Sequence, residues 1–154
     1  MVKTLCAALM ALSLVAAGCG GSDSEGSGDS SGGASIVVTT KEFPGYGVVL
    51  ANAEGRPLYV LDSDPKDGSK CVDACVQQFP PVEGTGEADG DVEGDNLSTF
   101  KREDGKTQVS YNGHALYTNT GEPLAGIGTK GQGGTWLLIS PKGEPVKTTA
   151  AGGY

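Results

Sequence analysis

The stretch STFKREDGKTQVSYNGHALYT, residues 98–118, decides the fold class of this chain. It contains three segments of strand-forming residues, separated by Asp104-Gly105 and by Asn112-Gly113. Asp-Gly and Asn-Gly are the strongest short hairpin signals, because both central residues of a type I′ turn need a positive φ. We therefore predict an antiparallel meander with strands at 98–103, 107–111 and 114–118.

Further strands are predicted on both sides of this meander, from runs of β-branched and other apolar residues. Two of them, 48–51 and 58–61, flank a turn at 52–55 and should form a hairpin. The others lie at 36–40, 135–140 and 146–148. Two Gly-rich stretches, the acidic 83–95 and 126–134, are expected to be flexible loops.

One short helix is predicted over residues 70–78, with Ser69 as its cap. Cys71, Cys75 and Phe79 are spaced by four residues, so they would lie on one face of this helix. A helix of about two turns is stable only when such a face packs on the rest of the protein.

The chain contains an internal repeat. Residues 55–59 match residues 113–117 at an offset of 58. With a shift of one, Phe79 aligns with Trp136. These matches predict two related strand-rich units, at about 45–82 and 98–145.

Neither unit has enough apolar residues to fold alone, so the two should pack together. We therefore expect a mainly β fold, in which two hairpin or meander units and one short helix form a single small domain over residues 36–149. The flanking segments are expected to be a signal peptide at 1–18, a disordered Gly/Ser linker at 19–35 and a flexible tail at 150–154.

The N-terminal residues are typical of an exported lipoprotein. Lys3 precedes an apolar run at 5–17, which is shorter than the roughly 20 residues that span a bilayer and suits a signal peptide. The run ends in VAAGC, residues 15–19, which resembles the lipobox of bacterial lipoproteins. The resemblance implies cleavage before Cys19 and a thioether-linked lipid on its sulfur. The alternative is an ordinary cleaved signal peptide followed by an unmodified cysteine.

The chain is acidic, with 19 Asp and Glu against 11 Lys and Arg and a formal charge of −8. Removal of Lys3 with the signal peptide would change this charge to −9. Such a charge disfavours nucleic acid, whose binding requires phosphate neutralisation, and it disfavours adsorption to anionic lipid. We therefore expect membrane attachment through acyl chains on Cys19, since two or more chains hold a protein stably.

The residues from about 45 to 145 are similar to the secreted repeat family of predicted bacterial lipoproteins, which is described by a conserved tyrosine-to-aspartate motif. The matching segments are GRPLY at 55–59 with Asp64, CVDAC at 71–75, FPP at 79–81, DG at 104–105, QVSYNG at 108–113, LY at 116–117 and GQGGTW at 131–136. Phe79 and Glu122 stand where the family usually has Trp and Asp. The resemblance implies an extracytoplasmic protein and brings no catalytic residue, because the family has no agreed activity.

Three interpretations remain open for Cys71 and Cys75, the only cysteines after Cys19. Export favours a local disulfide. Two thiolates one helical turn apart could instead bind Cu(I), a soft ion, or the pair could be redox-active. A disulfide here would close a very short loop, for which chain entropy gives only about 2 kcal/mol.

The remaining candidates are expected to have structural roles. Tyr59 with Asp64, and Tyr117 with Glu122, should form one tyrosine–carboxylate contact in each unit. The acidic turn at 62–68 invites a calcium interpretation, but it lacks the glycine and oxygen ligands at the positions that an EF-hand loop requires.

Together these patterns predict a lipid-anchored protein of the cell envelope, on the extracytoplasmic side of a bacterial membrane. It should be a non-enzymatic structural or binding module without a cofactor, and its ligand or protein partner is not specified by the sequence. The alternative is a Cu(I)-binding or thiol-redox accessory protein that uses Cys71 and Cys75.

Overall fold

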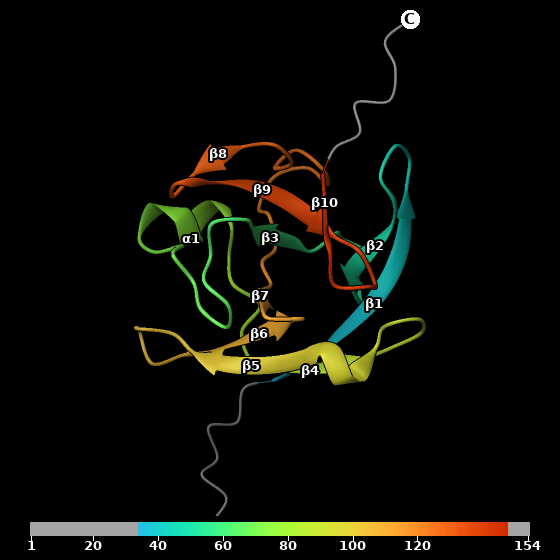
Figure 1. The fold of residues 1–154 in the computed structure, drawn as a ribbon, viewed down its shortest axis with the longest axis horizontal. Coiled ribbons are helices and arrows are strands. Elements are labelled where there is room, and N and C mark those ends of the chain that lie inside the picture. The colour runs from blue at the N-terminus through green and yellow to red at the C-terminus, as the bar shows by residue number, and fades with distance from the viewer. Residues whose placement is uncertain (1–33, 148–154) are drawn as a thin grey trace, which may run out of the picture. The chain divides into compact units, whose positions relative to one another are not determined.

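The computed structural model describes residues 34–147. The predicted signal peptide, Cys19, almost all of the linker and the C-terminal tail lie outside these residues. The described residues fall within one compact unit. Its elements in chain order (Figure 1) are β1 (Ser35–Phe43), β2 (Gly47–Asn52), β3 (Tyr59–Leu61), α1 (Ala74–Gln78), β4 (Thr85–Ala88), the 3-10 helix η1 (Gly94–Asn96), β5 (Leu97–Lys101), β6 (Thr107–Tyr111), β7 (His114–Ala115), β8 (Lys130–Gly131), β9 (Gly134–Ile139) and β10 (Pro145–Val146).

Within this part of the chain the strands form three small sheets. The first has the order β2-β1-β4, with β1 antiparallel to β2 and parallel to β4. The second has the order β10-β9-β3, and β8 also pairs with β9. The third is the meander β5-β6-β7. The fold is therefore mainly β with a short helix, as the sequence predicts.

The predicted meander is confirmed, but its two turns differ in conformation. Asn112 has φ 50 and Gly113 has φ 80, so both residues have the positive φ of a type I′ turn. At the other turn only Gly105 has a positive φ, of 81, and its N–H donates to the carbonyl of Arg102. The Asp-Gly turn therefore closes the β5–β6 hairpin in a different turn type.

The hairpin predicted around residues 52–55 is only partly formed. Its turn is closed by a hydrogen bond from Asn52 N–H to Arg56 O and by one from Leu58 N–H to Leu50 O, both 2.9 Å. β3 then leaves β2 and pairs with β9, while β2 pairs with β1. Pairing between strands far apart in the chain leaves no local sequence signal, so it was outside the prediction.

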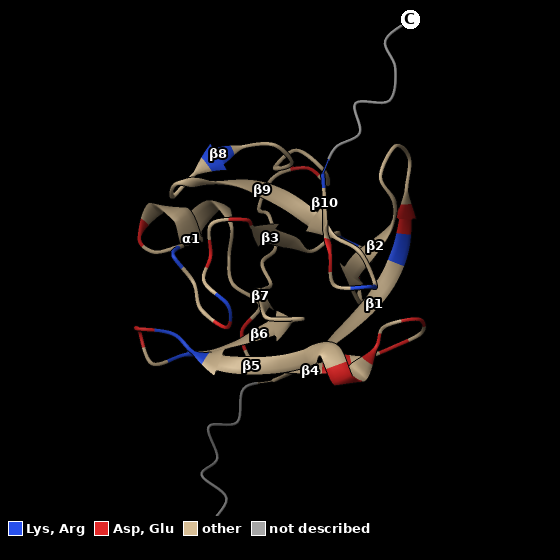
Figure 2. Ribbon diagram, in the orientation of Figure 1, with Lys and Arg blue, Asp and Glu red and all other residues tan. Residues whose placement is uncertain are grey.

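Both Gly-rich stretches expected to be flexible loops contain strands. β4 lies within 83–95 and pairs with β1, and β8 lies within 126–134 and pairs with β9. Gly86 lets β4 lie close to its neighbours, because a Cβ at this position would be 2.9 Å from Cγ1 of Val109. Residues 89–96 form the connection from β4 to β5, which carries Asp and Glu without Lys or Arg (Figure 2).

Helix α1 is shorter than predicted. It begins at Ala74, and its N-cap is Asp73 instead of Ser69. Asp73 has φ 53, outside the helical region. Ser69 Oγ accepts the N–H of Cys71 at 3.2 Å, a local bond of the kind that competes with helix formation. Among residues 34–147, no helix has the length and apolar character needed to cross a membrane.

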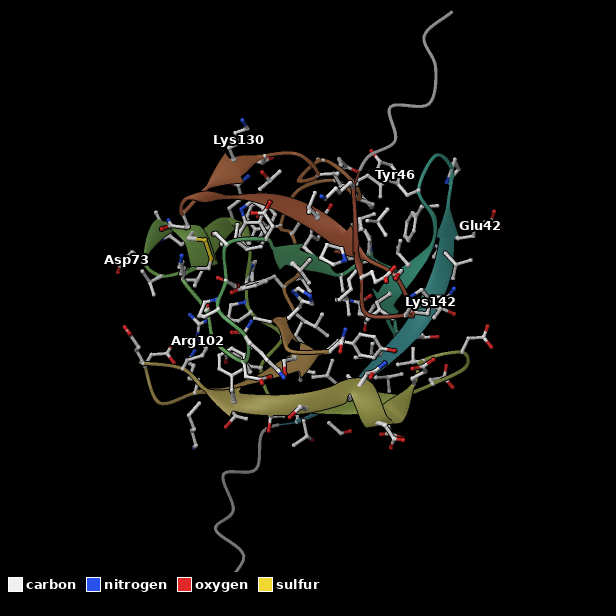
Figure 3. The ribbon with its side chains drawn as sticks, viewed as in Figure 1. Glu42, Tyr46, Asp73, Arg102, Lys130 and Lys142 are labelled. Atoms are coloured by element: carbon white, nitrogen blue, oxygen red, sulfur yellow. A yellow bond between two sulfur atoms is a disulfide. The ribbon has the colours of Figure 1, made fainter. Side chains whose placement is uncertain are left out.

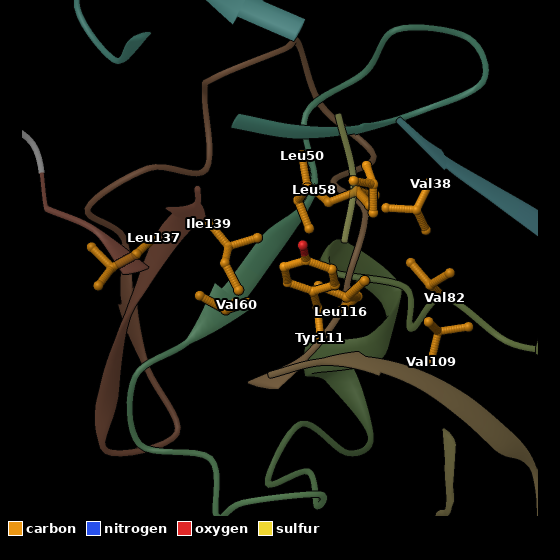
Figure 4. Packing of buried hydrophobic residues seen from close by; sticks show 11 residues of the cluster. Val38, Leu50, Leu58, Val60, Val82, Val109, Tyr111, Leu116, Leu137 and Ile139 are labelled. Atoms are coloured by element: carbon orange, nitrogen blue, oxygen red, sulfur yellow. The ribbon is translucent and has the colours of Figure 1, made fainter. Parts of the chain in front are cut away.

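The sheet containing β3 and β9 is buried on both faces. Val60, Leu137 and Ile139 belong to one buried cluster, whereas their neighbours Tyr59 and Trp136 belong to a second, aromatic cluster. Successive side chains of a strand point to opposite faces, so the two clusters lie on opposite sides of this sheet. Figure 4 shows the first cluster, which also includes Val38, Leu50, Leu58, Val82, Val92, Val109, Tyr111 and Leu116. This burial explains why both strands lack polar alternation.

Candidate functional site

Cys71 and Cys75 are joined by a disulfide bond beside α1 (Figure 3), with Cα atoms 5.2 Å apart. Cys71 is completely buried in the aromatic cluster, whereas Cys75 is partly exposed. Helix α1 starts between the two cysteines, so the bond ties its first turn to the preceding segment. One end of the disulfide is therefore sealed in the core and the other reaches the surface.

The buried guanidinium of Arg102 links the segment around Cys71 to the β5–β6 hairpin. Its Nη1 donates to Ser69 Oγ at 3.0 Å and to Gln108 Oε1 at 2.7 Å. Its Nη2 donates to the carbonyl of Cys71 at 2.8 Å. The nearest salt-bridge partner is the half-exposed carboxylate of Asp104, 3.4 Å from Nε. A buried charge is thus held mainly by neutral acceptors.

A second polar contact joins Tyr117 to Asp64. The Tyr117 hydroxyl donates to Asp64 Oδ2 at 2.6 Å and lies 2.6 Å from Ser69 Oγ, while Lys70 N–H donates to Asp64 Oδ1 at 2.7 Å. Burial raises the pKa of Asp64, and these two donated hydrogen bonds oppose the increase. Burial, together with the Asp64 carboxylate, also raises the pKa of Tyr117.

The expected tyrosine–carboxylate contact within each unit is wrong. Asp64 belongs to the first repeat and receives the hydroxyl of Tyr117 from the second. The Tyr59 hydroxyl is buried and makes no hydrogen bond to any described residue, and Glu122 is exposed. The reason is that Tyr59 and Tyr117 exchange backbone hydrogen bonds of 2.8 and 2.9 Å. This antiparallel bridge places the two repeats side by side, so contacts form between them.

The aromatic side chains of the two repeats also make equivalent contacts. Tyr59 meets Phe79 edge-to-face with ring centroids 5.6 Å apart, and Tyr117 meets Trp136 edge-to-face at 4.9 Å. Phe79 and Trp136 stack on each other at 3.8 Å with an interplanar angle of 8°. Matching residues therefore pair with each other around a local two-fold axis, which relates the first unit to the second.

A cleft of about 770 Å³ lies beside the disulfide. Its lining includes apolar Val72 and Phe100, acidic Asp73 and Asp104, and the buried Arg102. Figure 3 labels Asp73 and Arg102. Val72 is 41% exposed, one of two large hydrophobic residues that are exposed in the described part of the chain. The lining also includes Lys101 and Glu103, so the cleft carries charges of both signs beside an apolar surface that can receive a small apolar group.

The sequence analysis did not predict the buried hydrogen-bond network that joins Arg102 to Gln108 and Ser69. Gln108 and Ser110 occupy alternate positions of β6, which in a sequence predicts a solvent-facing side. The structure buries both. The pattern could not show that Arg102, from the turn of the same hairpin, would bond to Gln108 and that Asp67 would accept the Ser110 hydroxyl.

The carboxylates of the acidic turn at 62–68 accept hydrogen bonds from other parts of the protein. Asp62 Oδ1 accepts the N–H of Thr135 at 2.7 Å, and Asp67 Oδ1 accepts the Ser110 hydroxyl at 3.1 Å. Across residues 34–147, no group of three or more His, Cys, Asp or Glu side chains is placed to hold a metal ion.

No known family model, curated protein or solved structure matches this chain. Its function is therefore inferred from its own residues.

Proposed function

We propose that this chain is an exported lipoprotein of the bacterial cell envelope, anchored by acyl chains on Cys19, with a non-enzymatic binding or structural domain. The observation that carries the proposal is the disulfide between Cys71 and Cys75. Structural disulfides persist in oxidising, extracytoplasmic compartments and are rare in the cytosol. The apolar run at 5–17 and the lipobox-like sequence at 15–19 support export and lipidation.

The charge of the domain supports an anchor made of hydrocarbon. Asp and Glu outnumber Lys and Arg, and acidic side chains occupy the connection from β4 to β5 (Figure 2). An acidic surface is repelled by anionic headgroups, so attraction to lipid must come from buried methylene groups, at about 0.8 kcal/mol each.

We also propose membership of the secreted repeat family. The support is that its quoted motifs fall on the contacts that join the two units. Tyr59 and Tyr117 form the central bridge, and Asp64 accepts the Tyr117 hydroxyl. A motif that maintains such contacts serves folding, which agrees with a module that has no catalytic residue. The cleft beside the disulfide is the binding surface that we assign to it.

Replacement of the acylation site tests the proposal. Cys19→Ala should move the protein from the membrane fraction, and from the detergent-rich phase of a cloud-point separation, into the soluble fraction. Alkylation with a membrane-impermeant reagent after reduction of intact cells should label Cys71 and Cys75 in a cell type whose envelope admits the reagent. A Cys19→Ala protein that remains in the detergent-rich phase would contradict lipid anchoring.

The second candidate function is thiol exchange, which one observation favours. Cys75 is partly exposed and Cys71 is buried, so an attacking thiolate would reach Cys75 first and leave Cys71 as the departing sulfur. Equilibration with dithiol buffers followed by alkylation and mass measurement tests this role. A pair that stays oxidised even in the most reducing physiological buffer would rule it out.

Cu(I) binding remains the other prediction for this cysteine pair. It requires both sulfurs as thiolates, so the test uses anaerobically reduced protein and Cu(I) held by a competing chelator. Uptake of one Cu(I) per chain that is lost in Cys71→Ala would support the prediction. Equal uptake by both proteins would contradict it.

A further inference from the structure

The two-fold relation between the units extends from the backbone to the polar contacts. Tyr59 and Tyr117 bridge each other, and their rings make equivalent edge-to-face contacts. The offset of 58 carries Asp64 onto position 122, which is Glu122. The counterpart of the Tyr117–Asp64 hydrogen bond would therefore be a hydrogen bond from Tyr59 to Glu122, which the described position of the loop does not form.

The donor of this second bond is present and unsatisfied. Tyr59 is 1% exposed, and its hydroxyl has no hydrogen-bond partner among residues 34–147. A buried O–H without an acceptor loses its hydration and gains no hydrogen bond that compensates for the loss. Burial raises the pKa of Tyr59, and the nearby backbone amides of Gly126 and Leu124 and the charge of Arg56 oppose the increase. These amides can only donate toward the hydroxyl oxygen, so the O–H itself is left without an acceptor.

The acceptor lies nearby in the chain, on the same loop as these amides. Glu122 is exposed, and its carboxylate makes no hydrogen bond or ion pair within the described residues. The base of the loop is held by Arg56, whose Nη2 donates to the carbonyl of Asn119 at 2.9 Å and to that of Gly121. Leu124 has φ 72, a left-handed conformation that costs a non-glycine residue energy.

We propose that the loop over residues 119–128 is a strap whose predominant position in solution is closed, with Glu122 accepting a hydrogen bond from Tyr59. The charge of Arg56 acts on the Tyr59 hydroxyl, and its guanidinium also donates a hydrogen bond to the loop at Asn119. In the closed position the positive charge of Arg56 therefore compensates the negative charge of the Glu122 carboxylate. Glutamate has one methylene more than aspartate, which gives the side chain reach from the loop. Each tyrosine would then be bonded to a carboxylate from the other unit.

A double-mutant cycle on the full-length chain in detergent micelles tests the strap. Tyr59→Phe and Glu122→Ala should each lower the folding equilibrium constant by about tenfold, as expected for a hydrogen bond to a charged group. The double variant should be no less stable than the weaker single variant, because both remove the same bond. Additive losses, or a Tyr59→Phe protein that is as stable as the original, would overturn the proposal.

Two controls accompany the cycle. Glu54→Ala removes another exposed carboxylate and should leave the folding constant unchanged. The cycle of Tyr117→Phe with Asp64→Asn measures the coupling of the bond already formed in the other half. Independently of any variant, the closed strap predicts an NMR cross-peak between the Glu122 γ protons and the Tyr59 ring. A spectrum without that cross-peak counts against the closed position.

Discussion

Arg102 is the residue on which the polar interior depends most. Its guanidinium supplies the donors for Gln108, Ser69 and the Cys71 carbonyl. Arg102→Met would leave the Gln108 Oε1 acceptor buried without its donor and would remove the charged donor from Ser69 and from the Cys71 carbonyl, so we expect the free energy of unfolding to fall by about 3 kcal/mol. Urea denaturation followed by Trp136 fluorescence measures the change.

Lys106→Met provides the matched control for Arg102. Lys106 makes a 3.0 Å ion pair with Glu83, but both side chains are substantially exposed, at 59% and 41%. Exposed ion pairs contribute roughly 0–1 kcal/mol, so this variant should have nearly the original stability. If both variants lost the same free energy of unfolding, the buried network of Arg102 would contribute no more to stability than an exposed ion pair.

Asp64 should give the domain a specific pH dependence. Burial raises the pKa of this carboxyl above its ordinary value of 3.8, so the folded protein binds the proton more tightly than the unfolded chain. The stability that Asp64 contributes is therefore fully present below that value and is lost as the pH rises through the raised pKa. Compared with Asp64→Asn, the original protein should lose free energy of unfolding from about pH 4 upward.

The measurement for Asp64 is a series of urea denaturations of both proteins across the acid range. The pKa of exposed Asp104 is lowered, first by the N–H of Lys106, but this group titrates in both proteins and cancels in the difference. If the stability of the original protein relative to Asp64→Asn instead increased with pH, the assignment of a raised pKa would be contradicted.

Among the structural elements, α1 is the one that the disulfide supports. The cysteines are separated by 4 positions, so the closed loop is short and chain entropy predicts a stabilisation of about 2 kcal/mol. The three sheets are built without either cysteine. Cys71→Ala with Cys75→Ala should therefore lower the free energy of unfolding by about this amount and leave the far-ultraviolet circular dichroism of the sheets unchanged. Loss of the sheet signal would contradict a merely local role.

Local chemistry determined which elements could be predicted from the sequence. Asn112-Gly113 fixes its turn through backbone conformation alone, so the meander was predictable. The helix start was not, because Ser69 bonds to Cys71 and to Arg102 in ways that its neighbours in the chain do not reveal. The pairings of β1 with β4 and of β3 with β9 join distant segments, and periodicity carries no information about such partners.

The candidate site was also predictable only where the information is local in the sequence. The cysteine spacing allowed a disulfide, and the repeat identified Tyr59 and Tyr117 as matching residues. The sequence could not show that matching residues contact each other across the two units, because that depends on the two-fold arrangement. As a result the Tyr117–Asp64 bond was assigned to the wrong partners.

For the molecule as a whole, the two repeats make one folding unit because each supplies half of the aromatic cluster. The stack of Phe79 on Trp136 and the bridge of Tyr59 with Tyr117 join the halves. A single repeat would expose these rings to water, which agrees with the low apolar content of each unit. The domain that we propose to be held at a membrane is therefore the complete pair of repeats.

Intact-mass spectrometry of the protein extracted from its native cells tests the proposed lipid anchor most directly. The proposal predicts a chain that begins at Cys19 and carries the added mass of a diacylglycerol thioether, with a further mass loss of two hydrogens for the disulfide between Cys71 and Cys75. A chain that retains residues 1–18, or one that begins at Cys19 without lipid mass, would contradict it.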